Sequence, residues 1–268
     1  SHTTRFAKSI ITKPHTKHIC YCHTPPRFLW HFSGEGNYGI GELLMTKLRI
    51  FDQVSASRVD YFLAGSENAK RRIKRVYGRD SRVVYPSIDL ERFQGVKTFN
   101  GDYFVVISRL NKYKRVNLAI EACLKLGKPL KIVGTGPEMD KLKVQSVKGK
   151  VESQIEFLGN IDDEKVVQVL AGCHALIVPG VEDFGLTPLE AQALGKPVIA
   201  YKDGGVLETV IHGKTGIFFD EATIDSLVST MVRFNDLNHL SSLEAVKNAS
   251  RFSKQNFKRN FQAIIASV

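Results

Sequence analysis

The chain is 268 residues long, with 43% hydrophobic residues, 24% charged residues and a formal net charge of +11. That composition fits a soluble globular protein of one or two domains and excludes a disordered chain. No apolar run approaches the roughly 20 residues that cross a bilayer and no secretory signal is visible, so we expect a cytoplasmic protein.

The first third, residues 1–95, is expected to form part of an α/β domain. Periodicity and composition predict strands at 18–22, 59–64 and 82–85, and helices at 40–54 and 66–77. These elements are too few for a complete Rossmann-like domain. A linker is expected over 86–100.

Two patterns in this third allow other functions. Gly34, Gly36 and Gly39 have the spacing of a dinucleotide-binding fingerprint, which raises the alternative of an NAD-dependent oxidoreductase. That fingerprint needs an acid at the far end of the following strand, whereas Asp60 stands at its start. A second glycine turn, 134–136, lacks the third glycine, so the oxidoreductase is disfavoured.

The cysteines give no sign of a metal site. Cys20 and Cys22 have no second paired cluster elsewhere, since Cys123 and Cys173 stand alone. Cys20 and Cys22 would share one face of a strand and are expected to pack in the core.

The excess positive charge is concentrated in the first third. Residues 1–95 hold 16 Lys and Arg against 8 Asp and Glu, and the remainder holds 22 against 19. Seven of these cations surround the helix expected at 66–77, which could be solvated or could meet nucleic acid, a phosphorylated substrate or the inner face of an anionic membrane. We favour the membrane, because no nucleic-acid-binding pattern accompanies them. They are Lys70, Arg71, Arg72, Lys74, Arg75, Arg79 and Arg82.

Residues 96–249 read as a complete doubly wound α/β domain. Short apolar strands alternate with helices, and ligands of such a sheet bind at the carboxyl ends of the strands. The strands are expected at 103–108, 130–133, 155–158, 174–178, 197–201 and 216–219.

Polar side chains follow these strands. Arg109 and Lys114 come after the first strand and could clamp a diphosphate, although either could be ordinary surface charge. Glu182 and Glu190 follow the fourth strand, flanking a helix expected to start at Thr187-Pro188. The amides at that start favour phosphate or an electron-rich sugar oxygen. The alternative is that Thr187 and Glu190 form a capping box and that Glu182 is a solvated loop residue.

The string from Glu182 to Glu190, with Ser108-Arg109-Leu110 and Lys114, resembles the retaining glycosyltransferases of family 4, which have the GT-B fold. The resemblance implies that Glu182 contacts the donor hexose and Glu190 the nucleotide ribose, while Arg109 and Lys114 neutralise the leaving diphosphate. It also implies donor contacts by Phe184, Gly185, Leu186 and Thr187, and contacts to the base by Gly159, Asn160 and Ile161.

Residues 22–30 and 65–89 resemble the end of the acceptor domain of a bacterial mannosyltransferase-like branch of that family. His23 matches a histidine that approaches the donor hexose, although a histidine after a strand is more often structural. Mannose from GDP-mannose, transferred with retention to a glycan or lipid-linked hydroxyl, is the implied reaction. No Asp-x-Asp occurs, so no cofactor or metal is expected, and no lysine signals a pyridoxal-phosphate phosphorylase.

The same resemblance implies roughly a hundred further residues ahead of His23, which is consistent with ordinary domain size. Residues 1–95 are therefore expected to be a partial acceptor-side domain, and a separate subunit could supply the rest. A non-catalytic nucleotide-sugar-binding module or one half of a split enzyme stays open as an alternative. Residues 250–268 are expected to form a helix, with Phe252, Phe257 and Phe261 on one face, that packs back on this lobe or simply fills core.

Overall fold

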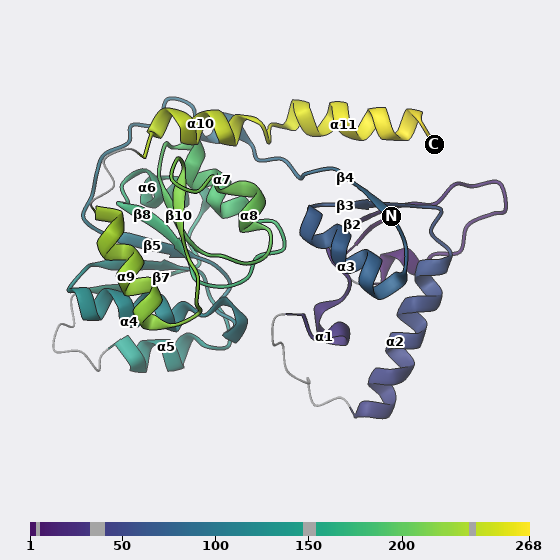
Figure 1. Cartoon of the computed structure of the whole chain (residues 1–268), viewed down its shortest axis with the longest axis horizontal. Coiled ribbons are helices and arrows are strands. Elements are labelled where there is room, and N and C mark those ends of the chain that lie inside the picture. Colours follow the sequence, from purple (N-terminus) through teal and green to yellow (C-terminus); the bar gives the residue numbers. More distant parts are fainter. Residues whose placement is uncertain (4–5, 33–40, 147–153, 236–239) are drawn as a thin grey trace. The chain divides into compact units, whose positions relative to one another are not determined.

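The computed structural model describes residues 1–3, 6–32, 41–146, 154–235 and 240–268 (Figure 1). The chain divides into two compact units, which we describe separately. Unit 1 comprises Ser1–Pro86 and Phe257–Val268, and unit 2 comprises Ser87–Asn256.

Unit 1 is a parallel four-stranded sheet with helices. The strands, in spatial order, are β1 (His2–Thr3), β2 (Ile19–Cys22), β3 (Tyr61–Ala64) and β4 (Ser81–Val83). The helices of its first segment are α1 (Arg27–Trp30), α2 (Glu42–Ser57) and α3 (Glu67–Tyr77), with a short 3-10 turn, η1 (Ala7–Ser9). β1 was not predicted. The glycine pattern at 34–39 lies outside the described residues.

Local sequence explains the ends of α3. The Ser66 hydroxyl accepts a hydrogen bond from the Ala69 amide at 2.9 Å, which caps the first turn. Gly78 ends the helix at φ +68°, a conformation that glycine adopts without strain. Asp60, the acid that follows the glycine pattern, accepts a hydrogen bond from the His18 amide at 2.7 Å.

The core of unit 1 includes Cys20 and Cys22, both buried against Ile73. The last helix, α11 (Lys254–Ala266), contributes Phe257 and Phe261 to a second cluster around Tyr21, Leu63 and Val84. This helix begins at Lys254 and not at residue 250 as predicted. Phe252 therefore precedes the helix and belongs to unit 2, where its ring contacts Phe184 of the same unit at a centroid distance of 5.5 Å.

Unit 2 contains all six predicted strands. Their spatial order is β10 (Gly216–Phe219), β9 (Val198–Tyr201), β8 (Ala175–Val178), β5 (Phe104–Ile107), β6 (Leu130–Val133) and β7 (Ile155–Gly159), all parallel. The chain proceeds outward from β5 in one direction and then from β8 in the other. The order of the sheet therefore reverses between β5 and β8, where doubly wound folds bind their ligands.

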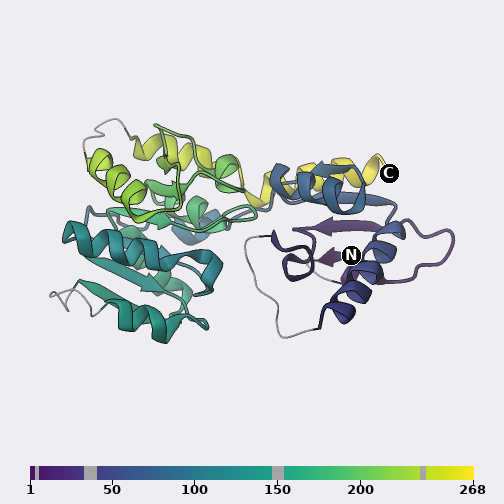
Figure 2. The ribbon, with the colours of Figure 1, turned by 60° about the horizontal axis from the view of Figure 1, so that its bottom comes forward.

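Helices cover both faces of this sheet. α4 (Val116–Leu126) packs against α5 (Met139–Ser146) and α9 (Ile224–Asn235), a layer that Figure 2 turns toward the viewer. α7 (Leu186–Ala193) packs against α10 (Ser242–Ser250) in the other layer. The remaining helices are α6 (Asp163–Ala171) and α8 (Val206–Thr209).

The boundary between the units lies at Pro86, not near residue 95. The Ile88 amide donates to the Phe252 carbonyl at 2.9 Å, and Ile88 pairs with Ser253. The segment expected to be a linker forms the 3-10 turn η3 (Leu90–Phe93) and buries Phe93. It therefore belongs to the structure of unit 2.

Candidate functional site at the ends of β5 and β8

The reversal of strand order positions the site. We call it the β5–β8 edge, which comprises the carboxyl ends of β5 and β8, the loops at 108–114 and 179–185, and the start of α7. A small cavity of about 10 Å³ lies there, lined in part by Ser108, Lys114, Glu182 and Thr187. Residues far apart in the sequence thus meet at one point.

Lys114 and Glu182 form the ion pair of this edge. Lys114 ends the 3-10 turn η4 (Lys112–Lys114), and its Nζ donates to Oε1 of Glu182 at 2.5 Å. Their side chains are 13% and 22% exposed, so the pair is shielded but still open to solvent. This contact joins the loop after β5 to the loop after β8.

Glycines let the loops of this edge approach closely. A Cβ on Gly180 would stand 2.6 Å from the Cα of Lys114, so only glycine fits there. Gly204 (φ +78°) lies against the carbonyl of Glu182, to which the Gly205 amide donates at 2.8 Å. The Gly204-Gly205 pair therefore supports the backbone that carries Glu182.

The start of α7 differs from the prediction. The helix begins at Leu186 with Gly185 (φ +102°) as its N-cap, and no side chain caps it. The capping-box alternative is wrong, because Thr187 lies inside the first turn. Glu190 pairs with Arg92 instead, with 3.6 Å between Oε1 and Nη1.

Arg92 was not predicted as a site residue. It lies in η3, and its Nη2 also stands 3.2 Å from Oδ2 of Asp163, at the start of α6. Burial raises the pKa of Glu190, whereas Arg92 acts to lower it and Asp163 to raise it further. No local signal in the sequence connects Arg92 to Glu190, which is 98 positions away.

The other predicted donor-site residues of unit 2 lie along the same edge of the sheet. Arg109 is exposed, and no described residue forms an ion pair with its guanidinium; it does not line the cavity. Gly159 ends β7 at φ +66° and accepts a bond from the Gly134 amide at 2.7 Å. Asn160 is exposed and Ile161 half-buried. These three residues are two strands away from β5.

His23 lies in unit 1, directly after β2. Its Nε2 is 2.6 Å from Nε2 of His2, and its ring meets Tyr21 edge-on at a centroid distance of 5.1 Å. Two neutral imidazoles, or one neutral and one protonated, can share such a hydrogen bond. His2 was not predicted, because a two-residue strand gives almost no pattern.

Several cations around α3 serve the structure of unit 1. Lys74 pairs with Asp80 at 2.9 Å, and Lys70 pairs with Glu67 at 3.2 Å. Arg79 donates to the Val59 carbonyl at 2.7 Å. Arg72 and Arg82 donate to the hydroxyls of Thr24 and Ser267.

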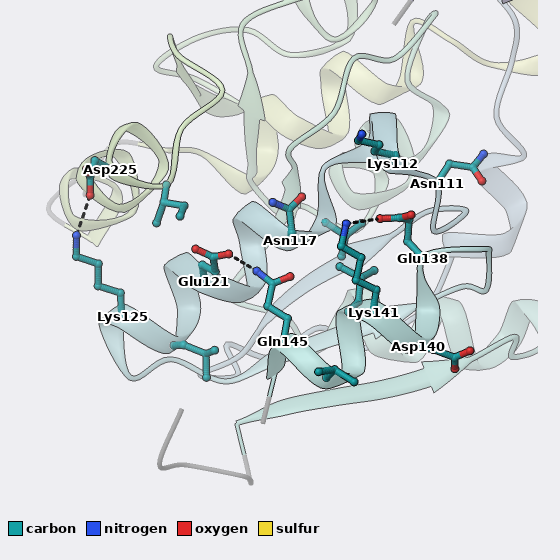
Figure 3. Close-up of a pocket in the computed structure, with 15 residues that line it drawn as sticks. Asn111, Lys112, Asn117, Glu121, Lys125, Glu138, Asp140, Lys141, Gln145 and Asp225 are labelled. Carbon is teal, nitrogen blue, oxygen red and sulfur yellow. Dashed lines mark hydrogen bonds and ion pairs between the residues drawn. The ribbon is translucent and has the colours of Figure 1, made fainter. Parts of the chain in front are cut away.

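A wide groove of about 1110 Å³ lies elsewhere, between α4, α5 and the start of α9 (Figure 3). Lys125 of α4 pairs with Asp225 of α9 across it at 2.7 Å, and Lys141 pairs with Glu138, three residues earlier in the chain, at 3.5 Å. No predicted site residue lines it. The groove is therefore not where the sequence and the sheet topology place a site.

Two further findings concern the described part of the chain. No group of three or more His, Cys, Asp or Glu residues in it is arranged to hold a metal ion. No helix in the same residues combines the length and apolar character needed to cross a membrane.

Comparison with known proteins gives a family match and several relatives. The family model "Glycosyl transferases group 1" matches residues 87–257. The chain is 27% identical over 247 residues to alpha-1,3/1,6-mannosyltransferase ALG2 of Dictyostelium discoideum, covering 75% of this chain and 58% of that protein. It is 33% identical over 161 residues to a glycogen synthase of Pseudomonas aeruginosa, covering 57% of this chain and 30% of that protein. The chain thus spans only part of these relatives.

Solved structures confirm the fold prediction. The structure of Anabaena HepE in complex with UDP and glucose aligns with a TM-score of 0.76 at 22% identity, covering 94% of this chain and 72% of that one. The apo lipopolysaccharide outer core galactosyltransferase WaaB aligns with a TM-score of 0.74 at 21% identity, covering 95% and 69%. Both units are therefore Rossmann-like, as in GT-B glycosyltransferases.

Proposed function

We propose that this chain, which belongs to the group 1 glycosyl transferases, binds a nucleoside diphosphate sugar at the β5–β8 edge and transfers its hexose. The observation that supports this best is the Lys114–Glu182 pair, 2.5 Å long and incompletely shielded, at the reversal of the sheet. A cation and an anion held together there offer charge to a phosphate and acceptors to sugar hydroxyls.

The chemistry follows from charge development in the reaction. When the bond from the sugar to the phosphate breaks, negative charge grows on the leaving diphosphate. The Lys114 ammonium, the exposed Arg109 guanidinium and the amides at the start of α7 would stabilise that charge. Glu182, held by Lys114, would accept hydrogen bonds from hexose hydroxyls.

The remaining roles are part of the same proposal. Glu190 binds the nucleotide ribose, the segment 184–187 contributes contacts to hexose and diphosphate, and Gly159–Ile161 contacts the base. His23 is proposed to contact the hexose solely because of the family resemblance. Transfer proceeds with retention, the leaving phosphate oxygen taking the proton of the acceptor hydroxyl as the new bond forms. Product stereochemistry measured by NMR tests this, and an inverted product would remove it.

The donor and acceptor are proposed by analogy with relatives. GDP-mannose is favoured as donor, supported by the likeness to ALG2, although the relatives also include glycogen synthases and HepE was crystallised with UDP and glucose. The acceptor is a glycan or a lipid-linked sugar. Contact with an anionic membrane through α3, and a separate subunit completing unit 1, remain proposals.

A non-catalytic nucleotide-sugar-binding module is the second candidate. It is favoured by the family match, which covers residues 87–257 and so coincides with unit 2 alone. Binding of a nucleotide without transfer or hydrolysis of the sugar donor would support it.

Calorimetric titration of the chain with UDP and with GDP tests the proposal, followed by assays with UDP-glucose and GDP-mannose. We expect one nucleotide to bind and Lys114→Met to abolish most of that binding. Lys112→Met is the matched control, since it removes an exposed lysine from the same turn. If neither nucleotide binds, or both variants behave alike, the β5–β8 edge is not a donor site.

A further inference from the structure

We infer that Arg92 is a positioning residue of the donor site, which keeps the Glu190 carboxylate ionised and available to the donor's hydroxyl groups. This rests on the proposed function, in which Glu190 binds the ribose of the nucleotide.

The geometry joins three segments that are distant in the sequence. The Arg92 guanidinium stands 3.6 Å from Glu190 on α7 and 3.2 Å from Asp163 on α6. The neighbouring Phe93 is 7% exposed, and its ring centroid lies 5.7 Å from the Arg92 Cζ. A buried anchor beside the arginine thus fixes the place from which the guanidinium reaches both acids.

Glu190 keeps its hydrogen-bonding capacity open. A distance of 3.6 Å is too long for a hydrogen bond, so Arg92 contributes charge without occupying an acceptor position. Within the described residues no hydrogen bond to the Glu190 carboxylate is found. An ionised carboxylate can accept from both hydroxyls of a vicinal diol, whereas the protonated form must donate from one oxygen. The ionised state is therefore the one that fits a ribose.

Apart from Arg92, the surroundings of Glu190 disfavour the ionised form of its carboxyl group. Its side chain is 23% exposed, and burial raises the pKa of Glu190. Asp163, the second acid beside the guanidinium, raises this pKa as well, and Arg92 is the group that lowers it. These are the charged groups that face Glu190 from η3 and α6. Removing Arg92 would leave the half-buried Glu190 carboxyl close to a second acid, Asp163.

The test is the binding of UDP and GDP from about pH 5.5 to about pH 8.5, measured by calorimetry as the ratio of each variant to wild type at the same pH. We expect Arg92→Met to bind about tenfold more weakly at the acidic end and to approach wild type at the alkaline end. Arg92→Lys keeps a charge and should stay near wild type. Asp163→Asn should shift the profile in the opposite direction. Circular dichroism verifies that each variant is folded.

Two outcomes would overturn the inference: Arg92→Met binding like wild type at every pH, or weaker by one constant factor. Glu190→Gln separates the inference from the proposed function, since it should weaken binding at all pH values. If Glu190→Gln is weak and Arg92→Met is normal, only the role of Arg92 fails. If Glu190→Gln binds like wild type, or wild type binds neither nucleotide, the ribose role proposed for Glu190 fails with it.

Discussion

The two units each contain a shielded pair of lysine and carboxylate, and the pairs differ in what surrounds them. In unit 1, Lys8 and Asp52 are fully buried and hydrogen-bonded to each other. The second oxygen of Asp52 accepts from the Trp30 indole at 2.9 Å and from the Tyr77 hydroxyl at 2.8 Å. Every charge in that cluster is matched inside the protein.

In unit 2, Lys114 and Glu182 are partly exposed, and within the described residues their charged atoms have no other hydrogen bond. They stand at the carboxyl ends of strands, whereas Asp52 lies on the buried face of a helix. The comparison teaches that a closed ionic cluster specifies structure, while an open one at a sheet edge is available to a ligand.

The largest effect on stability is expected from Asp52→Ala. The substitution removes the carboxylate that is paired with the buried Lys8 ammonium, so the free energy of unfolding should fall by about 3–5 kcal/mol. Trp30 is the single tryptophan and donates to Asp52, so its fluorescence reports on unit 1 during urea unfolding. Asp80→Ala, which breaks an exposed pair with Lys74, is the control. If Asp52→Ala lowered the free energy of unfolding by less than about 1 kcal/mol, the Lys8–Asp52 pair would contribute no more than an exposed ion pair does.

Glu182→Gln is expected to have a large effect on transfer and a small effect on stability. Transfer should slow by about 10²–10³-fold, the loss typical of one group that stabilises a transition state, or about 2.7–4 kcal/mol. Stability should change by less than about 1 kcal/mol, because the pair is partly exposed. Rate and urea unfolding are measured on the same preparation. A large loss of stability with normal transfer would assign Lys114 and Glu182 to structure.

Tyr77→Phe tests how much the Tyr77 hydroxyl stabilises the buried Lys8–Asp52 pair of unit 1. The Tyr77 hydroxyl donates to a buried carboxylate, and a hydrogen bond to a charged group contributes about 1.5–3 kcal/mol. Burial, with Asp52 adding to it, raises the pKa of Tyr77 above its ordinary range, so the phenol stays protonated as a donor. Urea unfolding followed by Trp30 fluorescence should show this loss. If the free energy of unfolding did not change, the contacts of Trp30 and Lys8 would be enough to stabilise the Asp52 carboxylate without the Tyr77 hydroxyl.

The smallest effect is expected for the stability of Glu190→Gln. Because burial raises the pKa of Glu190 in the folded chain, folded protein holds more protons there than unfolded protein, and stability falls as pH rises through that window. Glutamine removes this penalty, so stability should rise by up to about 1 kcal/mol at neutral pH and match wild type in acid. Circular dichroism follows the unfolding. Destabilisation at neutral pH would show that Glu190 supports the fold.

Much of unit 2 could be predicted because its strands are covered on both faces and therefore form continuous apolar runs. The alternation of strands and helices predicts a parallel sheet, in which the loops after the strands lie at one edge. Lys114 and Glu182 were predicted as site residues because they follow β5 and β8. The prediction that the helix starts at Thr187 was wrong, because α7 begins at Leu186. Thr-Pro usually starts a helix, and the sequence does not reveal that Gly185 at φ +102° starts this one earlier.

Arg92 could not be predicted from the sequence. It stands in a short segment in which apolar residues such as Leu90 and Phe93 show no regular spacing, and a short 3-10 turn has no period to detect. Its contacts with Glu190 and Asp163 depend on how η3 packs against two helices. The contact of His2 with His23 was missed for the same reason, since neither partner lies in a periodic segment.

A crystal structure of the chain with UDP or GDP bound decides where the donor site lies. We predict a diphosphate oxygen about 3 Å from the Lys114 Nζ, at the ends of β5 and β8, with the ribose hydroxyls on Glu190. A nucleotide seated in the groove between α4 and α5, with the Lys114–Glu182 pair untouched, would contradict this assignment.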